Sequence, residues 1–402
     1  MRRRHAARLL AFLLFLPASS IHAQQDEAAW ALWATAMDRI TGRYYQEVSE
    51  QSLTEAAVKH IIERTGPAAI RLQPAGYGAN PKECREVFRK FIIGAAALPG
   101  RRTDAFGLTE TALEEIAAHQ LDFCKYDRLA DVEASSHAGD ASPGLRLDIQ
   151  ADGRLLCRPR EGASAWRAGI RFGDELISID DQPLKGLSRL RVRSLLRGST
   201  GSVAMLQTSS TSGKVLRTGV RREVEPPSRP GLDTASLVPV LRIPEFTHDT
   251  PAALSHLLES LPPQSWLTID LRGNSGGDLN EAVDCAAMFL TGPRPINVCT
   301  KKSHSGAVPL SSKQECLVKL RGILILVDGG TASSAELFTL ALLEGCATRV
   351  TIGGTKTYGK GLYQEQQVLD GGGSLALTVG QLATMKGTIW HKTGIQPTFG
   401  GK

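Results

Sequence analysis

The amino-acid sequence predicts a multidomain α/β protein, in which a helical N-terminal region and a small β-rich module precede a larger α/β core. Three different sequence patterns along the chain support this fold class. Apolar residues recur at helical spacings in the first third, short strand-like runs broken by turns follow, and strand-like and helical runs then alternate. The 402 residues give room for two or three domains. We expect a leader at 1–23, the helical region at 24–138, the β-rich module at 139–226 and the core at 227–402.

The leader has the pattern of a secretory signal peptide. Four arginines (Arg2, Arg3, Arg4 and Arg8) precede the short apolar run Leu9–Leu16, Pro17 follows, and Ala23 offers a cleavage position. An uncleaved membrane anchor is the alternative, but the apolar run is shorter than the roughly 20 residues that cross a bilayer. We therefore expect a periplasmic or secreted protein without stable membrane insertion.

The net charge argues against some partners. The formal charge of +6 falls to +2 on cleavage, because the leader carries four arginines and no acid. A chain this close to neutrality gives no electrostatic reason to bind nucleic acid or an anionic membrane.

Seven cysteines in an exported chain suggest that some of them pair. The candidate pairs are Cys84 with Cys124 and Cys299 with Cys316, although spacing alone does not fix connectivity. Cys285 and Cys346 lie in apolar helical patterns and are expected to be buried thiols. No Cys-x-x-Cys or paired-histidine array is present, so we expect no zinc or other metal site.

The helical region contains three amphipathic stretches, DEAAWALWATAMDRI, LTEAAVKHIIERT and ETALEEIAAHQL. Trp30 and Trp33 lie three residues apart on one helix face, and we expect them to pack rather than to bind a ligand. The Gly/Ser/Asp-rich link at 135–144 then introduces the β-rich module.

In the β-rich module, the small helix SAWRAG leads through the turn FGD to the alternating strand ELISID and a two-residue polar turn. This order resembles a PDZ domain, with LSRLRVRSLLRG (187–198) as its second helix. The resemblance implies that Gly144, Leu145, Arg146 and Leu147 bind the C-terminal end of an extended peptide by strand addition. A small β-barrel without a ligand is the alternative.

After a Pro-rich connector at 222–231, the core alternates strands and helices. WLTIDLRG and GILILVDG are expected strands, and GDLNEAVDCAAMFL and AELFTLALLEG are expected helices. Asp278 is the expected N-cap of the first helix, with Leu279, Val283, Ala286 and Leu290 on its buried face. Crossover units of this kind form a largely parallel sheet.

Sites in such sheets gather where strands end and helices begin. Two junctions have that place, LRGNSGG (271–277) and DGGTASSAE (328–336), and TKTYGKGLYQ (355–364) places one lysine between two glycines. In this order, and after a PDZ-like module, the three blocks resemble those of the C-terminal processing peptidases, which are serine proteases of the Ser-Lys type (family S41). The likeness runs from about residue 37 to the C-terminus and implies a crotonase/ClpP-like protease core.

The resemblance also implies a role for individual residues. Ser333 would be the nucleophile, Lys360 the general base and Gln364 the residue that orients the lysine. The oxyanion hole would use backbone amides of Ser334 and of the glycine turn, Gly276 or Gly277. No cofactor is implied. The expected partners are protein or peptide substrates with accessible C-termini, and a homo-oligomer or an adaptor stays open.

The chemistry is reasonable on physical grounds. A serine hydroxyl is a poor nucleophile until a base removes its proton. A lysine can act as that base only when neutral, and its ordinary pKa of about 10.4 must fall towards 7, which requires burial without a carboxylate partner. Lys360 has glycines on both sides and no acid within three residues. At a helix N-terminus, Ser333 would lie near positive dipole ends.

These residues also allow other roles. Ser333 could serve simply as the N-cap of the helix that follows it, without a catalytic role. Alternatively, Ser334 could be the nucleophile. Glu336 is expected to stabilise the first helical turn, Thr331 and Thr357 to support the site through hydrogen bonds, and His391 to be structural, although a Ser-His-Asp triad is not excluded.

The sequence also bears on other functions. GGTKTYGKG is not a P-loop, because Gly361 follows the lysine. No serine has a lysine three residues on, which argues against a β-lactamase type of site. A catalytically silent peptide-binding scaffold is the main rival function.

Overall fold

The structure is a computed structural model that describes residues 18–99, 103–136, 139–150, 153–160, 162–185, 187, 189–224, 229–263, 265–291, 295–301, 307–346, 348–370 and 372–399. The chain forms two compact units. Unit 1 comprises Met1–Asp38, Ser49–Pro226 and Gln366–Ala376, and unit 2 comprises Arg39–Val48, Pro227–Glu365 and Leu377–Lys402. Most of the predicted leader lies outside the described residues. Within them, no helix is both long and apolar enough to cross a membrane.

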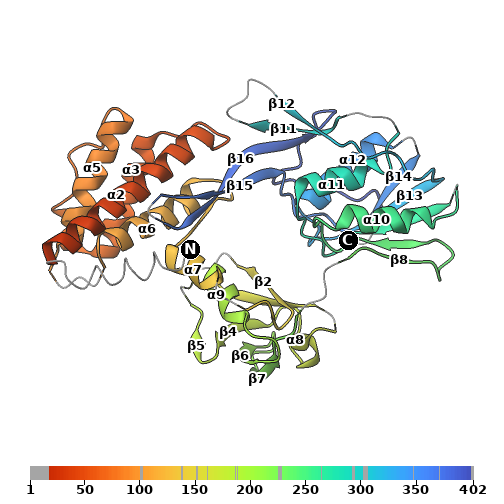
Figure 1. Ribbon diagram of the computed structural model, residues 1–402, viewed down its shortest axis with the longest axis horizontal. Coiled ribbons are helices and arrows are strands. Elements are labelled where there is room, and N and C mark those ends of the chain that lie inside the picture. Colours follow the sequence, from red (N-terminus) through yellow and green to blue (C-terminus); the bar gives the residue numbers. More distant parts are fainter. Residues whose placement is uncertain are drawn as a thin grey trace, which may run out of the picture. The chain divides into compact units, whose positions relative to one another are not determined.

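The N-terminal part of the chain is helical, as predicted (Figure 1). Its elements are α2 (Ala18–Arg43), α3 (Glu50–Thr65), α4 (Pro67–Ile70), α5 (Pro81–Ala96), α6 (Ala105–Glu115), the π-helical turn η1 (Ile116–Gln120), β1 (Lys125–Asp127) and α7 (Leu129–Ser136). Side chains of Ser49, Asn80 and Asp104 accept hydrogen bonds from the first turns of α3, α5 and α6. The Trp33 ring is fully buried and stacks on Phe88 at 3.6 Å between centroids, which confirms the predicted packing role.

The β-rich module is a sheet in the order β2-β3-β4-β6-β7, with β5 paired to β4. Its elements are β2 (Leu145–Ile149), β3 (Leu155–Pro159), α8 (Ser164–Arg167), β4 (Glu175–Ile179), β5 (Gln182–Pro183), α9 (Arg189–Leu196), β6 (Val203–Ser209) and β7 (Val215–Arg221). The predicted helix, strand, polar turn and second helix are therefore confirmed. Asp180 and Asp181 both have positive φ (47° and 63°), which suits a tight two-residue hairpin.

One buried arginine fixes the end of α9. The Arg222 guanidinium donates to the carbonyls of Leu195 and Leu196, at 3.0 Å each, and to Asp180 at 2.9 Å. These bonds satisfy two of the carbonyls that a helix C-terminus leaves without partners. Directly after α9, Gly198 and Ala141 exchange two backbone hydrogen bonds, so the end of α9 is joined to the segment that leads into β2.

The core of unit 2 is the predicted, largely parallel sheet. Its order is β14-β13-β10-β9-β8, and only the β8–β9 pair is antiparallel. Its elements are β8 (Gly231–Asp233), β9 (Val240–Arg242), α10 (Thr250–Glu259), β10 (Trp266–Asp270), α11 (Leu279–Ala287), β13 (Gly322–Val327), α12 (Ser334–Gly345) and β14 (Arg349–Gly354). Asp278 caps α11 as predicted, and Val283, Ala286 and Leu290 are buried.

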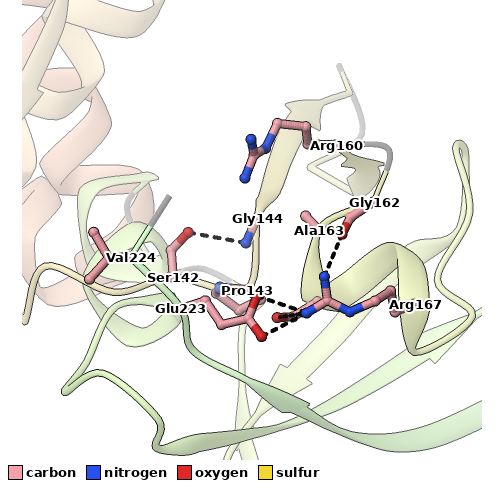
Figure 2. Close-up of a pocket in the computed structure, with 10 residues that line it drawn as sticks. Ser142, Pro143, Gly144, Arg160, Gly162, Ala163, Arg167, Glu223 and Val224 are labelled. Atoms are coloured by element: carbon pink, nitrogen blue, oxygen red, sulfur yellow. Dashed lines mark hydrogen bonds and ion pairs between the residues drawn. The ribbon is translucent and has the colours of Figure 1, made fainter. Parts of the chain in front are cut away.

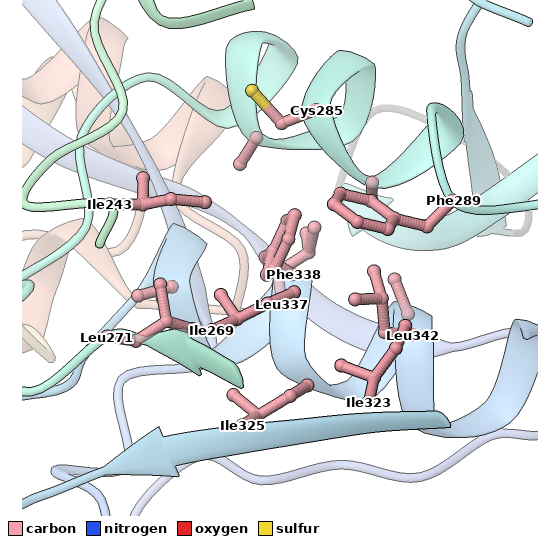
Figure 3. Close-up of a cluster of buried hydrophobic side chains, with 14 of the residues drawn as sticks. Ile243, Ile269, Leu271, Cys285, Phe289, Ile323, Ile325, Leu337, Phe338 and Leu342 are labelled. Carbon is pink, nitrogen blue, oxygen red and sulfur yellow. The ribbon is translucent and has the colours of Figure 1, made fainter. Parts of the chain in front are cut away.

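The apolar side chains of α12 lie between the strands and α11, with Leu337, Phe338 and Leu342 in contact with the same cluster as Ile269, Ile325 and Cys285 (Figure 3). A second sheet of unit 2 pairs β16 (Ser374–Thr384) with β11 (Pro295–Lys301), and β11 with β12 (Ala307–Ser311). The strand β15 (Leu362–Val368) pairs with β16. Because α12 is buried on nearly all sides, its N-terminus has a fixed position at the carboxyl ends of β10 and β13.

The candidate disulfide pairs are wrong. Cys84 and Cys124 are both buried and form no disulfide, and their thiols donate to different backbone carbonyls, those of Gly78 and Asp122. Cys316 is also free, which excludes its pairing with Cys299. Cys285 is a buried thiol, as predicted, and burial raises its pKa. Cys346 follows α12 and is only half-buried.

Candidate active site

The turn between β13 and α12 places Ser333 at the N-cap of α12. Its backbone has φ 58° and ψ −123°, a conformation that costs a non-glycine residue about 1–3 kcal/mol and is most often found at functional sites. Ser333 and Glu336 form a capping box at the start of α12, in which Glu336 Oε2 accepts the Ser333 amide. An ordinary N-cap has β-region dihedrals, so capping alone does not account for the strained backbone of this serine. The half-buried Ser333 is reachable from solvent, whereas Ser334 is 1% exposed.

The Glu336 carboxylate, fully buried, joins the serine turn to the lysine segment. Its Oε2 accepts the backbone amide of Ser333 at 2.9 Å and that of Lys360 at 2.8 Å. Since both nitrogens bond one oxygen, they are at most 2.9 + 2.8 = 5.7 Å apart. Its Oε1 accepts the Thr357 hydroxyl at 2.5 Å and the Gly359 amide at 2.7 Å. Burial raises the pKa of Glu336, and these four hydrogen bonds oppose that rise.

The lysine segment holds Lys360 beside Gln364. Lys360 is half-buried, and its Nζ donates to Gln364 Oε1 at 2.6 Å. Gln364 lies on β15, so a strand positions it. Gly359 has φ 92°, and a Cβ there would lie 2.9 Å from the Gly394 nitrogen, which explains a glycine directly before the lysine. The Gln364 side chain is a neutral amide, which orients an amine without the full charge that a carboxylate would bring.

The glycine turn after β10 packs directly on the serine. A Cβ on Gly276 would lie 2.9 Å from Ser333 Cβ and 3.0 Å from the Ala332 carbonyl oxygen, so only glycine fits there. Asn274 fixes this turn: its Oδ1 accepts the Gly276 amide at 2.8 Å, and its Nδ2 donates to the Ile243 carbonyl at 2.9 Å. Of the three predicted oxyanion donors, the Gly276 amide is thus already engaged. The amides of Gly277 and Ser334 donate to no described residue.

Polar side chains hold the two junctions together. The Thr331 hydroxyl donates to the Leu271 carbonyl at 2.9 Å, and Asp328 Oδ1 accepts the Gly273 amide at 2.9 Å. The Thr357 hydroxyl accepts the Ile395 amide at 2.7 Å. The predicted hydrogen-bonding support from Thr331 and Thr357 is confirmed. The roles of Asp328 and Asn274 were not predicted. The signal that could have indicated them is an acid or an amide directly at the end of a strand.

The residues predicted to bind a peptide lie at the start of β2. This strand is the edge of its sheet among the described residues, which leaves room for strand addition. Leu145 is buried, Leu147 is half-buried and packs on the same cluster as α9, and Arg146 is exposed. The Gly144 amide donates to Ser142 Oγ at 3.1 Å.

A separate pocket of about 280 Å³ lies behind that loop (Figure 2). Ser142, Pro143 and Gly144 form one wall, and Arg167, in a two-oxygen ion pair with Glu223, forms another. None of the ten described residues that line it comes from α9. The pocket is therefore not the space between β2 and α9.

Comparisons with known proteins agree with this architecture. Residues 238–400 match the profile of peptidase family S41, and residues 156–208 match that of a PDZ domain. The carboxy-terminal processing protease CtpA of Bacillus subtilis (strain 168) is 28% identical over 257 residues, covering 63% of this chain and 54% of that protein. The carboxyl-terminal-processing protease of Synechocystis sp. is 28% identical over 308 residues, covering 72% and 70%. The match thus spans about half the length of the Bacillus relative.

Among solved structures, the photosystem II D1 C-terminal processing protease aligns with a TM-score of 0.63 at 22% identity, over 88% of this chain and 94% of that one. This similarity shows that the fold is shared. The fold and the two profile matches define a multidomain α/β chain that joins a PDZ domain to a peptidase domain. Residues 238–400 carry a domain of peptidase family S41, and the named relatives of the chain are carboxy-terminal processing proteases.

Proposed function

We propose that this chain is an exported serine endopeptidase that recognises the C-terminal tails of proteins through its PDZ domain and cleaves them with Ser333 and Lys360. The observation that carries the proposal is the shared Glu336 oxygen, which keeps the backbone nitrogens of Ser333 and Lys360 within 5.7 Å. The strained backbone of Ser333 and its solvent-accessible side chain support a nucleophilic role.

In the proposed reaction, the neutral Lys360 amine takes the proton of the Ser333 hydroxyl as Oγ bonds to the carbonyl carbon of the scissile peptide. The resulting oxyanion accepts hydrogen bonds from the amides of Gly277 and Ser334. Lys360 then gives its proton to the leaving amine as the C–N bond breaks, which leaves an ester on Ser333. The same amine then removes a proton from water as the water oxygen bonds to the ester carbon. The bond between that carbon and Ser333 Oγ breaks, the lysine ammonium returns its proton to Oγ, and the carboxylic acid product leaves. Gln364 keeps Nζ oriented throughout.

Two features support the exported, tail-binding part of the proposal. The basic leader has the pattern of a signal peptide. The unpaired edge of β2 offers the backbone groups of an incomplete sheet to an extended chain. N-terminal sequencing of the protein recovered from the periplasm or the medium should begin at Gln24.

Cleavage of an unfolded reporter protein with an apolar C-terminus tests the catalytic assignment. The chain from Gln24 should cut the reporter, and Ser333→Ala and Lys360→Ala should each abolish cutting while circular dichroism stays unchanged. Continued cleavage by Ser333→Ala would disprove the nucleophile. An unmodified chain that binds the tail and cuts nothing would favour the scaffold function.

A further inference from the structure

Basic charge is concentrated in the PDZ domain. Residues 139–226 contain fifteen lysines and arginines against ten acids, which leaves +5. The rest of the chain after residue 23 has twenty-eight basic and thirty-one acidic residues, which leaves −3. The near-neutral net charge of the chain after residue 23 is therefore the sum of a basic PDZ domain and a slightly acidic remainder. A net charge of one sign on a binding domain favours ligands of the opposite sign.

Part of this charge follows one face of α9. Val192 and Leu196 are buried against the domain core, and each is followed by an arginine, Arg193 and Arg197. These two arginines are four residues apart and so share a helix face next to the buried one. Arg193 is exposed, and neither arginine forms an ion pair with a described residue. Other arginines of the domain form ion pairs with Asp180, Asp181 and Glu223.

The end of α9 lies at the start of the binding strand. Gly198, directly after Arg197, pairs with Ala141, three residues before Gly144. Leu147 of β2 packs against the cluster that contains Val192 and Leu196 of α9, the residues that directly precede Arg193 and Arg197. A tail added along the β2 edge would thus have its terminal carboxylate near Arg197, with its preceding residues running beside α9 towards Arg193.

The spacing of the arginines matches that of an extended chain. Four helical residues advance about 6 Å, at 1.5 Å each. Two residues of an extended peptide advance about 6.6 Å. We propose that the PDZ domain selects tails with Asp or Glu two residues before the C-terminal residue, which pairs with Arg193 while Arg197 faces the terminal carboxylate. This specificity rests on the proposed tail binding.

The test uses the chain from Gln24 carrying Ser333→Ala, so that nothing is cut. Short labelled peptides with one apolar C-terminal residue carry Ala, Glu or Lys two residues before the end, and Glu is also moved one residue in either direction. Fluorescence anisotropy should show Glu at the proposed position binding about three- to fivefold tighter than Ala, and Lys more weakly, as for an exposed ion pair. The advantage should shrink with added salt.

A charge reversal makes the test specific. Arg193→Glu should invert the order, so that the Lys peptide binds best. Lys214→Glu, with the same charge change on the β6–β7 hairpin at the other edge of the sheet, should keep the original order. Equal binding of all peptides would overturn the specificity and leave tail binding intact. Binding of none would overturn both. Capture by anionic phospholipid vesicles, without discrimination among the peptides, would assign the arginines to a membrane surface instead.

Discussion

The carboxylate of Glu336 and the backbone amide of Lys360 are joined by a hydrogen bond of 2.8 Å, although 24 residues separate them in the chain. The same oxygen accepts the Ser333 amide. One side chain thus fixes both ends of the proposed catalytic pair, and the four groups around it are all donors.

Glu336→Gln should impair both stability and cleavage. An amide offers one acceptor oxygen, so its NH₂ group must face two of the four donors, which leaves buried amides without partners at about 1–3 kcal/mol each. We expect the unfolding free energy to fall by about 2–6 kcal/mol. The turnover of the folded fraction should fall at least tenfold. Glu281→Gln on α11 is the matched control. Among the described residues, the Glu281 carboxylate has a hydrogen bond only with the exposed His248. Unchanged denaturation and turnover in Glu336→Gln would contradict this account.

Gly276→Ala should reduce cleavage more than stability. The added Cβ would lie 2.9 Å from Ser333 Cβ, on a backbone with φ 108°, and the serine or the glycine turn must move. That movement would displace the adjacent Gly277 amide from the proposed oxyanion hole. Losing an oxyanion donor costs about 10²–10³ in turnover, and we expect a loss of that order. Gly329→Ala in the neighbouring loop is the control, since its Cβ would meet only the Lys356 carbonyl oxygen at 3.9 Å. Equal effects of the two alanines would argue against a role for the glycine turn.

Ser334→Ala should stabilise the protein and leave cleavage in place. The Ser334 hydroxyl is buried and has no hydrogen-bond partner among the described residues. Removing an unsatisfied buried hydroxyl should raise the unfolding free energy by about 1 kcal/mol. Chemical denaturation and the reporter assay measure both effects. Abolished cleavage in a folded Ser334→Ala variant would instead identify Ser334 as the nucleophile.

The buried Glu110 should make stability depend on pH. Burial raises the pKa of Glu110 above its ordinary value of 4.5, despite hydrogen bonds from Tyr126 and from the Leu129 amide. The folded state therefore binds a proton more tightly than the unfolded state, so stability is lost as pH rises from 4.5 through the raised value. Relative to Glu110→Gln, the unmodified chain should lose unfolding free energy across that window and then level off. A pH-independent difference between the two would refute the assignment.

Much of the fold follows from local pattern. The run GILILV predicts β13 because it is short, apolar and rich in β-branched residues, and the helical periods predict α11 and α12. The PDZ elements follow from alternation and turn residues. The strands β11, β12 and β16 were not predicted. The pairing of β11 with β16 joins segments more than 70 residues apart, which a local pattern does not reveal. The absence of the two candidate disulfides was not predicted for a related reason, since spacing carries no information on distance across the fold.

The candidate site was predictable in its residues and not in its connections. The order of the three sequence blocks predicted that Ser333, Lys360 and the glycine turn belong to one site. The second role of Glu336 did not follow from its position in a helical first turn, because its partners Gly359 and Lys360 come from another segment. Likewise, the Asn274 side chain distinguishes the Gly276 amide from that of Gly277, and no pattern of letters does so.

The buried Arg222 bears on how fast and how tightly a tail can bind. Its guanidinium holds the end of α9 before any ligand arrives. The recognition surface is therefore preorganised, and association should require little rearrangement of the domain. The conformational entropy lost on binding would then come mainly from the tail. A disordered C-terminus would then bind to a surface that needs no rearrangement. The dissociation rate of that tail would set the time for which the rest of the substrate is retained.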